Sequence, residues 1–297
     1  MAGPSGVGEG RAGAMLTVLD RLSLPGSPER PNEDTFGVAG NWAWILDGSI
    51  PPGHAPIMGE ASDAVWLVRF AGERFAALAP GAADGRALIA WAIGEARDAF
   101  LARAPNERRD PVSWPAAALT LVRASGGRIQ AWTLADTVAV VRDANGAVAT
   151  LNDAPALRAF ESGAAADMLR RTGTDPESVR QTPDFRAWME AGRLGRRPSG
   201  GVHGFGFRPE ALDRLRYESA AVEPGAVLLL ASDGFAALSG LYGCYDASGL
   251  MEAALDRGLA PLGRELRRVE TEVDPSGQRF PRFKCSDDAT ALLMRLA

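Results

Sequence analysis

The sequence NWAWILDGS at residues 41–49 combines an apolar run with an abrupt acidic end. Trp42, Trp44 and Leu46 alternate with smaller apolar residues, so we expect a strand that is buried on both faces. The strand ends in Asp47, and Gly48 allows the chain to turn sharply directly after the carboxylate. This stretch therefore predicts a buried β-strand that brings an aspartate to one end of a sheet.

Three further acidic clusters stand where other apolar runs start or stop. They are Glu33 and Asp34 in RPNEDTFGV, Asp233 in VLLLASDGF, and Asp287 and Asp288 in CSDDATALLMRL. Carboxylates beside buried strands are costly unless they are paired or bind a metal, and few cations lie near these clusters in the sequence. Oxygen ligands without a histidine suit Mg²⁺ or Mn²⁺ better than Zn²⁺. We interpret the four clusters as the ligands of two divalent cations.

Composition restricts the remaining possibilities. The chain has 297 residues, an apolar content of 46% and a net charge of -5, which indicates a sizeable core and gives no electrostatic reason to expect a nucleic acid or an anionic membrane as partner. Cys244 and Cys285 lie far apart and form no zinc or disulfide pattern. The sequence shows neither a signal peptide nor a run of about 18 apolar residues. We expect a soluble cytoplasmic protein.

Hydrophobic periodicity predicts one layered α+β domain over residues 14–297, after a loose tail at 1–13. Short connections between successive strands require antiparallel pairing. Residues 153–209 combine two helical segments with a Gly/Arg-rich loop and are interpreted as an insertion beside the sheet. The expected strands are 14–22, 36–39, 42–46, 114–124, 128–134, 137–142, 147–151, 215–222, 226–231 and 289–296, and the expected helices are 57–78, 84–103, 154–171, 176–191, 234–238, 249–257 and 262–272.

The order of these motifs, NED, DG after a strand, SDG after another and DD before a final strand, resembles the metal-dependent protein phosphatases of the PPM (type 2C) family, in its bacterial form. The resemblance extends from about Ala14 to Leu296. It implies a four-layer α-β-β-α sandwich, in which two central antiparallel sheets are flanked by pairs of helices.

The resemblance also implies metal-binding roles. Asp47 is expected to bridge two metals, and the carbonyl of Gly48 to bind one of them. Asp233 and Asp287 correspond to the other ligands of the first metal, and Glu33 to a ligand of the second.

Three other acidic residues receive supporting roles from the same resemblance. Asp34 is expected to orient bound water. Asp136, in LADTVAVV, corresponds to the aspartate of the family's Gly-Asp-Ser motif, which can hold a third, weaker metal. Asp288 stands where asparagine is common and is expected to support the ligands from behind.

The chain departs from the family pattern at two catalytic positions. Glu29 stands at the usual spacing of the phosphate-binding arginine, so Arg30 is the candidate for that role. Ser49 replaces a histidine thought to protonate the leaving group, and His54 is the candidate substitute. Arginines of the insertion either dock a phosphorylated partner or form a solvated loop; they are Arg193, Arg196, Arg197 and Arg208.

The implied activity is hydrolysis of phosphoserine or phosphothreonine in a protein substrate of a Ser/Thr kinase, by in-line attack of a hydroxide that bridges two Mn²⁺ or Mg²⁺ ions. We expect a monomer. No GxSxG, Walker or HExxH motif supports another enzyme class. Two alternatives stay open, namely a catalytically weak phosphatase-like binding module and a phosphatase of a small phosphorylated metabolite.

Overall fold

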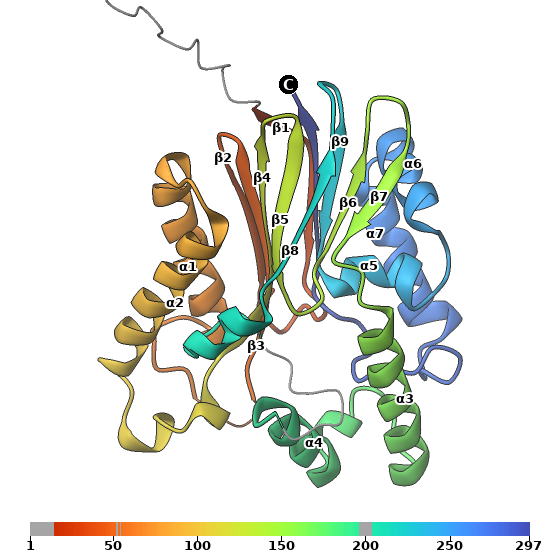
Figure 1. Ribbon diagram of the computed structural model, residues 1–297. Helices are drawn as coiled ribbons and strands as arrows, with labels where there is room; N and C mark the ends of the chain where they lie inside the picture. Colours follow the sequence, from red (N-terminus) through yellow and green to blue (C-terminus); the bar gives the residue numbers. More distant parts are fainter. Residues whose placement is uncertain (1–14, 52, 54, 196–203) are drawn as a thin grey trace, which may run out of the picture.

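The computed structural model describes residues 15–51, 53, 55–195 and 204–297, so the expected tail at 1–13 lies outside the described residues. Two five-stranded sheets pack face to face, and every strand pairs antiparallel with its neighbours (Figure 1). The predicted α+β sandwich is confirmed. Sheet A has the order β1 (Leu16–Leu24), β10 (Ala289–Leu296), β9 (Val227–Ala231), β6 (Val138–Arg142) and β7 (Val148–Leu151); sheet B has β2 (Asp34–Ala39), β3 (Trp42–Ser49), β4 (Ala116–Ser125), β5 (Arg128–Leu134) and β8 (Arg216–Ala221).

The strand β3 is buried on both faces, as its sequence predicts. Trp42, Trp44 and Leu46 belong to the core between sheet B and its helices. Ala43 and Ile45 belong to the core between the two sheets. Because successive side chains of a strand point to opposite faces, one alternating sequence supplies both hydrophobic layers.

Each sheet is covered on its outer face by helices, which yields the four layers seen in Figure 1. Sheet B carries α1 (Asp63–Leu78) and α2 (Gly85–Leu101), and sheet A carries α5 (Asp233–Gly240), α6 (Ala247–Arg257) and α7 (Leu259–Arg268). Asp84 caps α2, since its carboxylate accepts the main-chain N–H groups of Arg86 and Ala87 at 3.3 and 3.0 Å.

The first helix begins later than its apolar periodicity predicts. It starts at Asp63 rather than at residue 57, and Ser62 caps it by accepting the Val65 N–H at 3.1 Å. The Asp63 carboxylate also accepts the main-chain N–H groups of Ile57 and Met58 at 2.9 and 3.1 Å. These hydrogen bonds hold the preceding segment in a non-helical turn, so the expected start was wrong.

Residues 153–209 contain α3 (Pro155–Thr172) and α4 (Pro183–Arg193), which lie at the end of the sandwich reached by the last residues of β3 (Figure 1). The helix expected at 176–191 was wrong in its start. Pro183 stands in the first turn of α4, because proline is tolerated there and not in a helix interior.

The shorter helical turns complete the fold. In the expected helix 262–272, α7 ends at Arg268 and the chain continues in a π-helical turn. None of the described helices has the length and apolar character needed to cross a bilayer. The short turns are Ala79–Gly81, Asn106–Arg108, Pro111–Ser113, Val179–Gln181, Pro209–Arg214 and the π turn Val269–Val273.

Candidate metal centre

Strands β2 and β3 place the first acidic residues together. Asp34 and Asp47 lie directly opposite each other in the β2–β3 pair. One step beyond, the Gly48 N–H donates to the Glu33 carbonyl at 3.0 Å. A Cβ atom at position 48 would lie 2.5 Å from that carbonyl oxygen, so this approach of the two strands requires glycine.

Sheet A supplies the acidic residues on the other side. Asp233 starts α5 directly after β9, and Asp287 precedes β10. Asp288 joins the loops of both sheets, because its carboxylate accepts the main-chain N–H groups of Gly26 and Glu33 at 2.7 and 2.8 Å. The role that the resemblance implies for Asp288, a support behind the metal ligands, stays a prediction.

Asp136 occupies the turn between β5 and β6 and is held there by a strained backbone. Ala135 has a φ of 64°, a left-handed conformation that costs an alanine about 1 kcal/mol. The side-chain amide of Asn152 donates to the carbonyls of Ala135 and Thr137 at 3.2 and 2.5 Å. These bonds keep the turn in place and aim Asp136 at the end of the sandwich.

These segments enclose one cavity of about 340 Å³. It opens where the two sheets meet the insertion helices. Segments from both sheets, far apart in the sequence, line it. The acidic residues that line it are Glu33, Asp47, Asp136, Glu161, Asp233, Glu270 and Asp287. The structure therefore brings the predicted ligands Glu33, Asp47, Asp136, Asp233 and Asp287 into one space.

Burial and mutual repulsion raise the pKa of these carboxyl groups. Burial raises the pKa of Asp47 well above its usual range, and the nearby Asp34 and Asp233 raise it further. Burial and then Asp233 raise the pKa of Asp136 well above its usual range. The pKa of Asp233 is raised by burial and then by Asp287, and burial also raises that of Glu33. Confined negative charge of this kind is stabilised by a bound cation.

Asp34 is the carboxylate of this group whose buried charge has the least compensation. Only 8% of the residue is accessible, and neither carboxylate oxygen has a hydrogen-bond partner of normal geometry among the described residues. Burial, followed by repulsion from Asp288, raises its pKa well above the usual range. An uncompensated buried carboxylate is expensive, so its presence favours a function at this point.

The donor set fits the hard divalent cations expected from the sequence, because it consists of carboxylate oxygens and carbonyls. Within the part of the chain that the structure describes, however, no group of three or more His, Cys, Asp and Glu side chains has the arrangement of a metal site. Asp287 Oδ1 forms an ion pair with the ammonium of Lys284 and accepts the Asp288 N–H at 2.8 Å.

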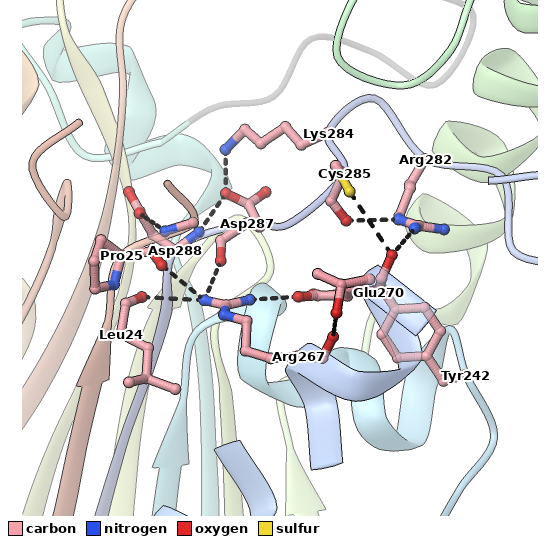
Figure 2. A network of polar contacts seen from close by, with 12 residues as sticks. Leu24, Pro25, Tyr242, Arg267, Glu270, Arg282, Lys284, Cys285, Asp287 and Asp288 are labelled. Carbon is pink, nitrogen blue, oxygen red and sulfur yellow. Dashed lines mark hydrogen bonds and ion pairs between the residues drawn. The ribbon is translucent and has the colours of Figure 1, made fainter. Parts of the chain in front are cut away.

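A polar network behind the centre fixes the loop that carries Asp287 (Figure 2). Arg267 donates through Nη2 to the main-chain carbonyl of Asp287 at 2.7 Å and to those of Leu24 and Pro25 at 3.3 and 3.1 Å. Its Nη1 bonds the buried carboxylate of Glu270 at 2.6 Å. One guanidinium thus joins α7, the end of β1 and the acidic loop.

The cavity also contains groups that the sequence patterns did not single out. Lys284 and Arg180 bring positive charge to its wall. Phe185, Trp188 and Phe283 form an aromatic wall, in which the Trp188 and Phe283 rings lie 4.5 Å apart. Isolated aromatic and basic residues carry no spacing signal, and only the rarity of lysine could have drawn attention to Lys284.

The structure describes one of the two candidate substitutes, Arg30, but not the other, His54. Arg30 forms an exposed ion pair with Glu177 and does not line the cavity. His54 lies outside the described residues, as do Arg196 and Arg197 of the insertion. Arg193 holds the end of β3, where it donates to the carbonyls of Trp114 and Ser49 at 2.5 and 3.2 Å.

Comparison with known proteins agrees with this architecture. The chain is similar to the Mycobacterium tuberculosis serine/threonine phosphatase PstP/Ppp, with a TM-score of 0.56 and 16% identity over 95% of this chain and 99% of that one. It is similar to PppA, described as a regulatory component of T6SS in Pseudomonas aeruginosa, with a TM-score of 0.54 and 16% identity over 96% and 99% of the two chains.

A third similar structure is the PstP catalytic domain in complex with two manganese ions, with a TM-score of 0.52 and 14% identity over 96% of this chain and 99% of that one. No curated protein matches the sequence. At these identities the solved structures establish the fold. The family model described as protein phosphatase 2C, however, matches residues 28–272, which is most of the chain. With the sandwich and the converging carboxylates, this match identifies the chain as a member of the protein phosphatase 2C (PPM) family, of the bacterial type.

Proposed function

We propose that this chain is a protein-serine/threonine phosphatase that depends on Mn²⁺ or Mg²⁺. The observation that carries the proposal is the cavity at the end of the sandwich, where carboxylates from both sheets gather with raised pKa values and without enough cationic partners. Family membership and the manganese complex of the similar PstP domain support the same conclusion.

In this proposal Glu33, Asp47, Asp233 and Asp136, with the Gly48 carbonyl, hold the cations. When bound, such cations acidify a water molecule and neutralise the charge that develops on phosphoryl oxygens. The main-chain bond between Gly48 and Glu33 sets the distance between the two strands that carry ligands. Ser62 orients Glu33 by donating to its Oε1 at 2.6 Å.

Asp34 acts on the attacking water. Its two carboxylate oxygens are buried and have no partner of normal geometry in the described part of the chain, and Asp34 does not itself line the cavity, so this role requires a water that reaches it beside Asp47. A carboxylate that accepts a proton from water orients the water's lone pair and assists its attack on phosphorus. Its position opposite Asp47 places this acceptor beside the ligands.

Arg180 supplies the positive charge that faces the phosphoryl group. It lies on the wall of the cavity, with its guanidinium 6.0 Å from the centre of the Phe185 ring. Among the described residues it forms no ion pair, so its donors are available for phosphoryl oxygens, which guanidinium groups bind well. Arg30 remains the candidate implied by the resemblance, and its pair with Glu177 would have to open.

The decisive experiment measures hydrolysis of p-nitrophenyl phosphate and of phosphoserine and phosphothreonine peptides, with Mn²⁺, with Mg²⁺ and with EDTA. We expect turnover that requires the cation and falls at least ~100-fold in Asp47→Asn. Asp98→Asn is the matched control, because the Asp98 side chain is 73% exposed on α2.

Two other outcomes separate the alternatives. Manganese binding without hydrolysis of any phosphomonoester would support a phosphatase-like binding module. Hydrolysis of small phosphorylated metabolites in preference to phosphopeptides would favour a metabolite phosphatase. Turnover that persists in EDTA and in Asp47→Asn would contradict the proposed chemistry.

A further inference from the structure

Lys284 occupies an unusual position for its residue type. It is the only lysine among the 32 lysine and arginine residues of the chain, and it lines the acidic cavity. Its ammonium group forms an ion pair with Oδ1 of Asp287, and its side chain is 33% exposed (Figure 2). A sequence that uses arginine everywhere else thus places a compact ammonium at this one position.

The surrounding structure holds Lys284 in place. The neighbouring Arg282 side chain is 9% exposed and donates to the carboxylate of Asp274 at 3.0 Å and to the carbonyl of Cys285 at 3.0 Å. This buried pair fixes the main chain on both sides of Lys284. The main chain at Lys284 is therefore fixed, and its ammonium is held at the cavity wall by the ion pair with Asp287.

Asp287 is held just as firmly from the other side. Its Oδ1 accepts both the Lys284 ammonium and the Asp288 N–H, and its main-chain carbonyl accepts Arg267 at 2.7 Å. A carboxylate engaged in this way has less negative charge to offer a metal. A divalent cation beside it would also lie close to an ammonium of the same sign, which lowers its affinity.

We propose that Lys284 is a built-in cation of this centre, which withdraws Asp287 from the ligand set so that the native chain binds one divalent cation tightly and a second one weakly. The inference rests on the proposed function only in that the centre binds divalent cations. It refines the expectation of two bound cations, because one of the positive charges is supplied by the chain itself.

The test is a Mn²⁺ titration of the full chain. Calorimetry and the electron paramagnetic resonance signal of free Mn²⁺ both monitor the binding. The native chain should bind one equivalent tightly and a second at least ~10-fold more weakly. Lys284→Met should tighten the second event at least ~10-fold, and Lys284→Gln should do the same if Met perturbs folding.

Two controls distinguish the loss of the Lys284–Asp287 pair from a general loss of positive charge in the cavity. Arg180→Met removes the same charge from the same cavity but frees no carboxylate, so it should change the weak event much less than Lys284→Met. Asp287→Asn should have little effect on the tight event in the native background and should abolish the gain in the Lys284→Met background. Such non-additivity is the signature of two groups that act as a pair.

Several results would overturn the inference. They are two equally tight equivalents in the native chain, an unchanged titration in Lys284→Met and Lys284→Gln, an equal gain in Arg180→Met, or no binding in any variant. The phosphatase proposal is judged separately by hydrolysis. A chain that binds two Mn²⁺ equally and hydrolyses phosphopeptides would refute the role of Lys284 alone, whereas the expected titration without hydrolysis would refute the enzyme alone.

Discussion

Asp34 and Asp274 are both buried aspartates, with 8% and 4% of the residue exposed, yet the protein treats them in opposite ways. The Asp274 carboxylate accepts the main-chain N–H groups of Gln278, Arg279 and Phe280 at 3.0, 3.2 and 2.9 Å, and it pairs with Arg282 at 3.0 Å. Asp34 has no hydrogen-bond partner of normal geometry in the described chain and faces other carboxyl groups.

The electrostatic consequences have opposite signs. Burial alone would raise the pKa of Asp274, but the hydrogen bonds from Phe280, Arg279 and Arg282 lower it overall. Burial and like charges raise the pKa of Asp34. A buried carboxylate with hydrogen-bond and ion-pair partners, such as Asp274, keeps its charge at little cost to the fold. A buried carboxylate without such partners, such as Asp34, can still accept a hydrogen bond from a ligand or water. The four predictions below test this difference.

The largest expected effect is the loss of stability when the carboxylate of Asp274 is removed. Asp274→Ala should lower the free energy of unfolding by about 3–5 kcal/mol, because it leaves the buried Arg282 and several N–H groups unpaired. Urea denaturation measures this change. Asp143→Ala, which removes a half-buried turn carboxylate bonded to main-chain N–H groups, serves as the control and should cost much less.

The second effect is a fall in metal-free stability as pH rises. The carboxyls of Asp34, Asp47, Asp136 and Asp233 have raised pKa values in the folded state, so above the ordinary pKa of about 4 the folded chain binds more protons than the unfolded chain. Stability should therefore decline from about pH 5 upward as the pH passes through the raised values.

Thermal melts in EDTA between acidic and alkaline pH measure this decline, and Mn²⁺ should reverse it most at the alkaline end. Asp274 works in the opposite direction, because its stabilising contribution is lost only as pH falls through its lowered pKa. Stability that rises steadily with pH in EDTA would show that the centre carries no excess of buried charge.

The third effect comes from Asp34 alone. Asp34→Asn should raise the metal-free free energy of unfolding by about 1–2 kcal/mol, because it removes repulsion within the centre and introduces a donor beside Asp47. The same variant should lose most phosphatase activity. If denaturation in EDTA shows a loss of stability instead, Asp34 is satisfied in a way that its surroundings do not indicate.

The smallest effect concerns the turn that aims Asp136. Ala135→Gly should raise the free energy of unfolding by about 0.5–1 kcal/mol, because glycine adopts the φ of 64° without steric cost. Activity should change little, since the hydrogen bonds from Asn152 maintain the turn. A destabilised variant would indicate that the alanine methyl group contributes packing worth more than the strain.

The strong regular patterns of the sequence predicted the fold well. The strands expected at 128–134 and 289–296 are observed with those bounds, and the alternation in residues 42–46 correctly placed β3 between two hydrophobic layers. The errors arose where a side chain competes with the backbone pattern. Asp63 holds residues 57 and 58 out of α1, and Pro183 moves the start of α4.

What the sequence determined by itself is the set of short-range instructions: which residues alternate, where apolar runs end, and which carboxylates stand at those ends. Local spacing is enough for these features, because strand and helix periodicities act over a few residues. It also supplied the ordered acidic motifs of the family.

Only the tertiary structure decided which charges neutralise one another. Asp287 forms an ion pair with Lys284, and Arg30 pairs with Glu177 and does not line the cavity. Asp34 has no described hydrogen-bond donor of normal geometry. Electrostatic pairing depends on distances of a few ångströms and on the water excluded between the groups. Arg30 and Glu177 belong to segments remote in the chain, whereas Lys284 and Asp287 are three residues apart and meet because of the conformation of their loop. No sequence spacing encodes those quantities, so the balance of charge that governs cation binding emerges when the two sheets close on each other.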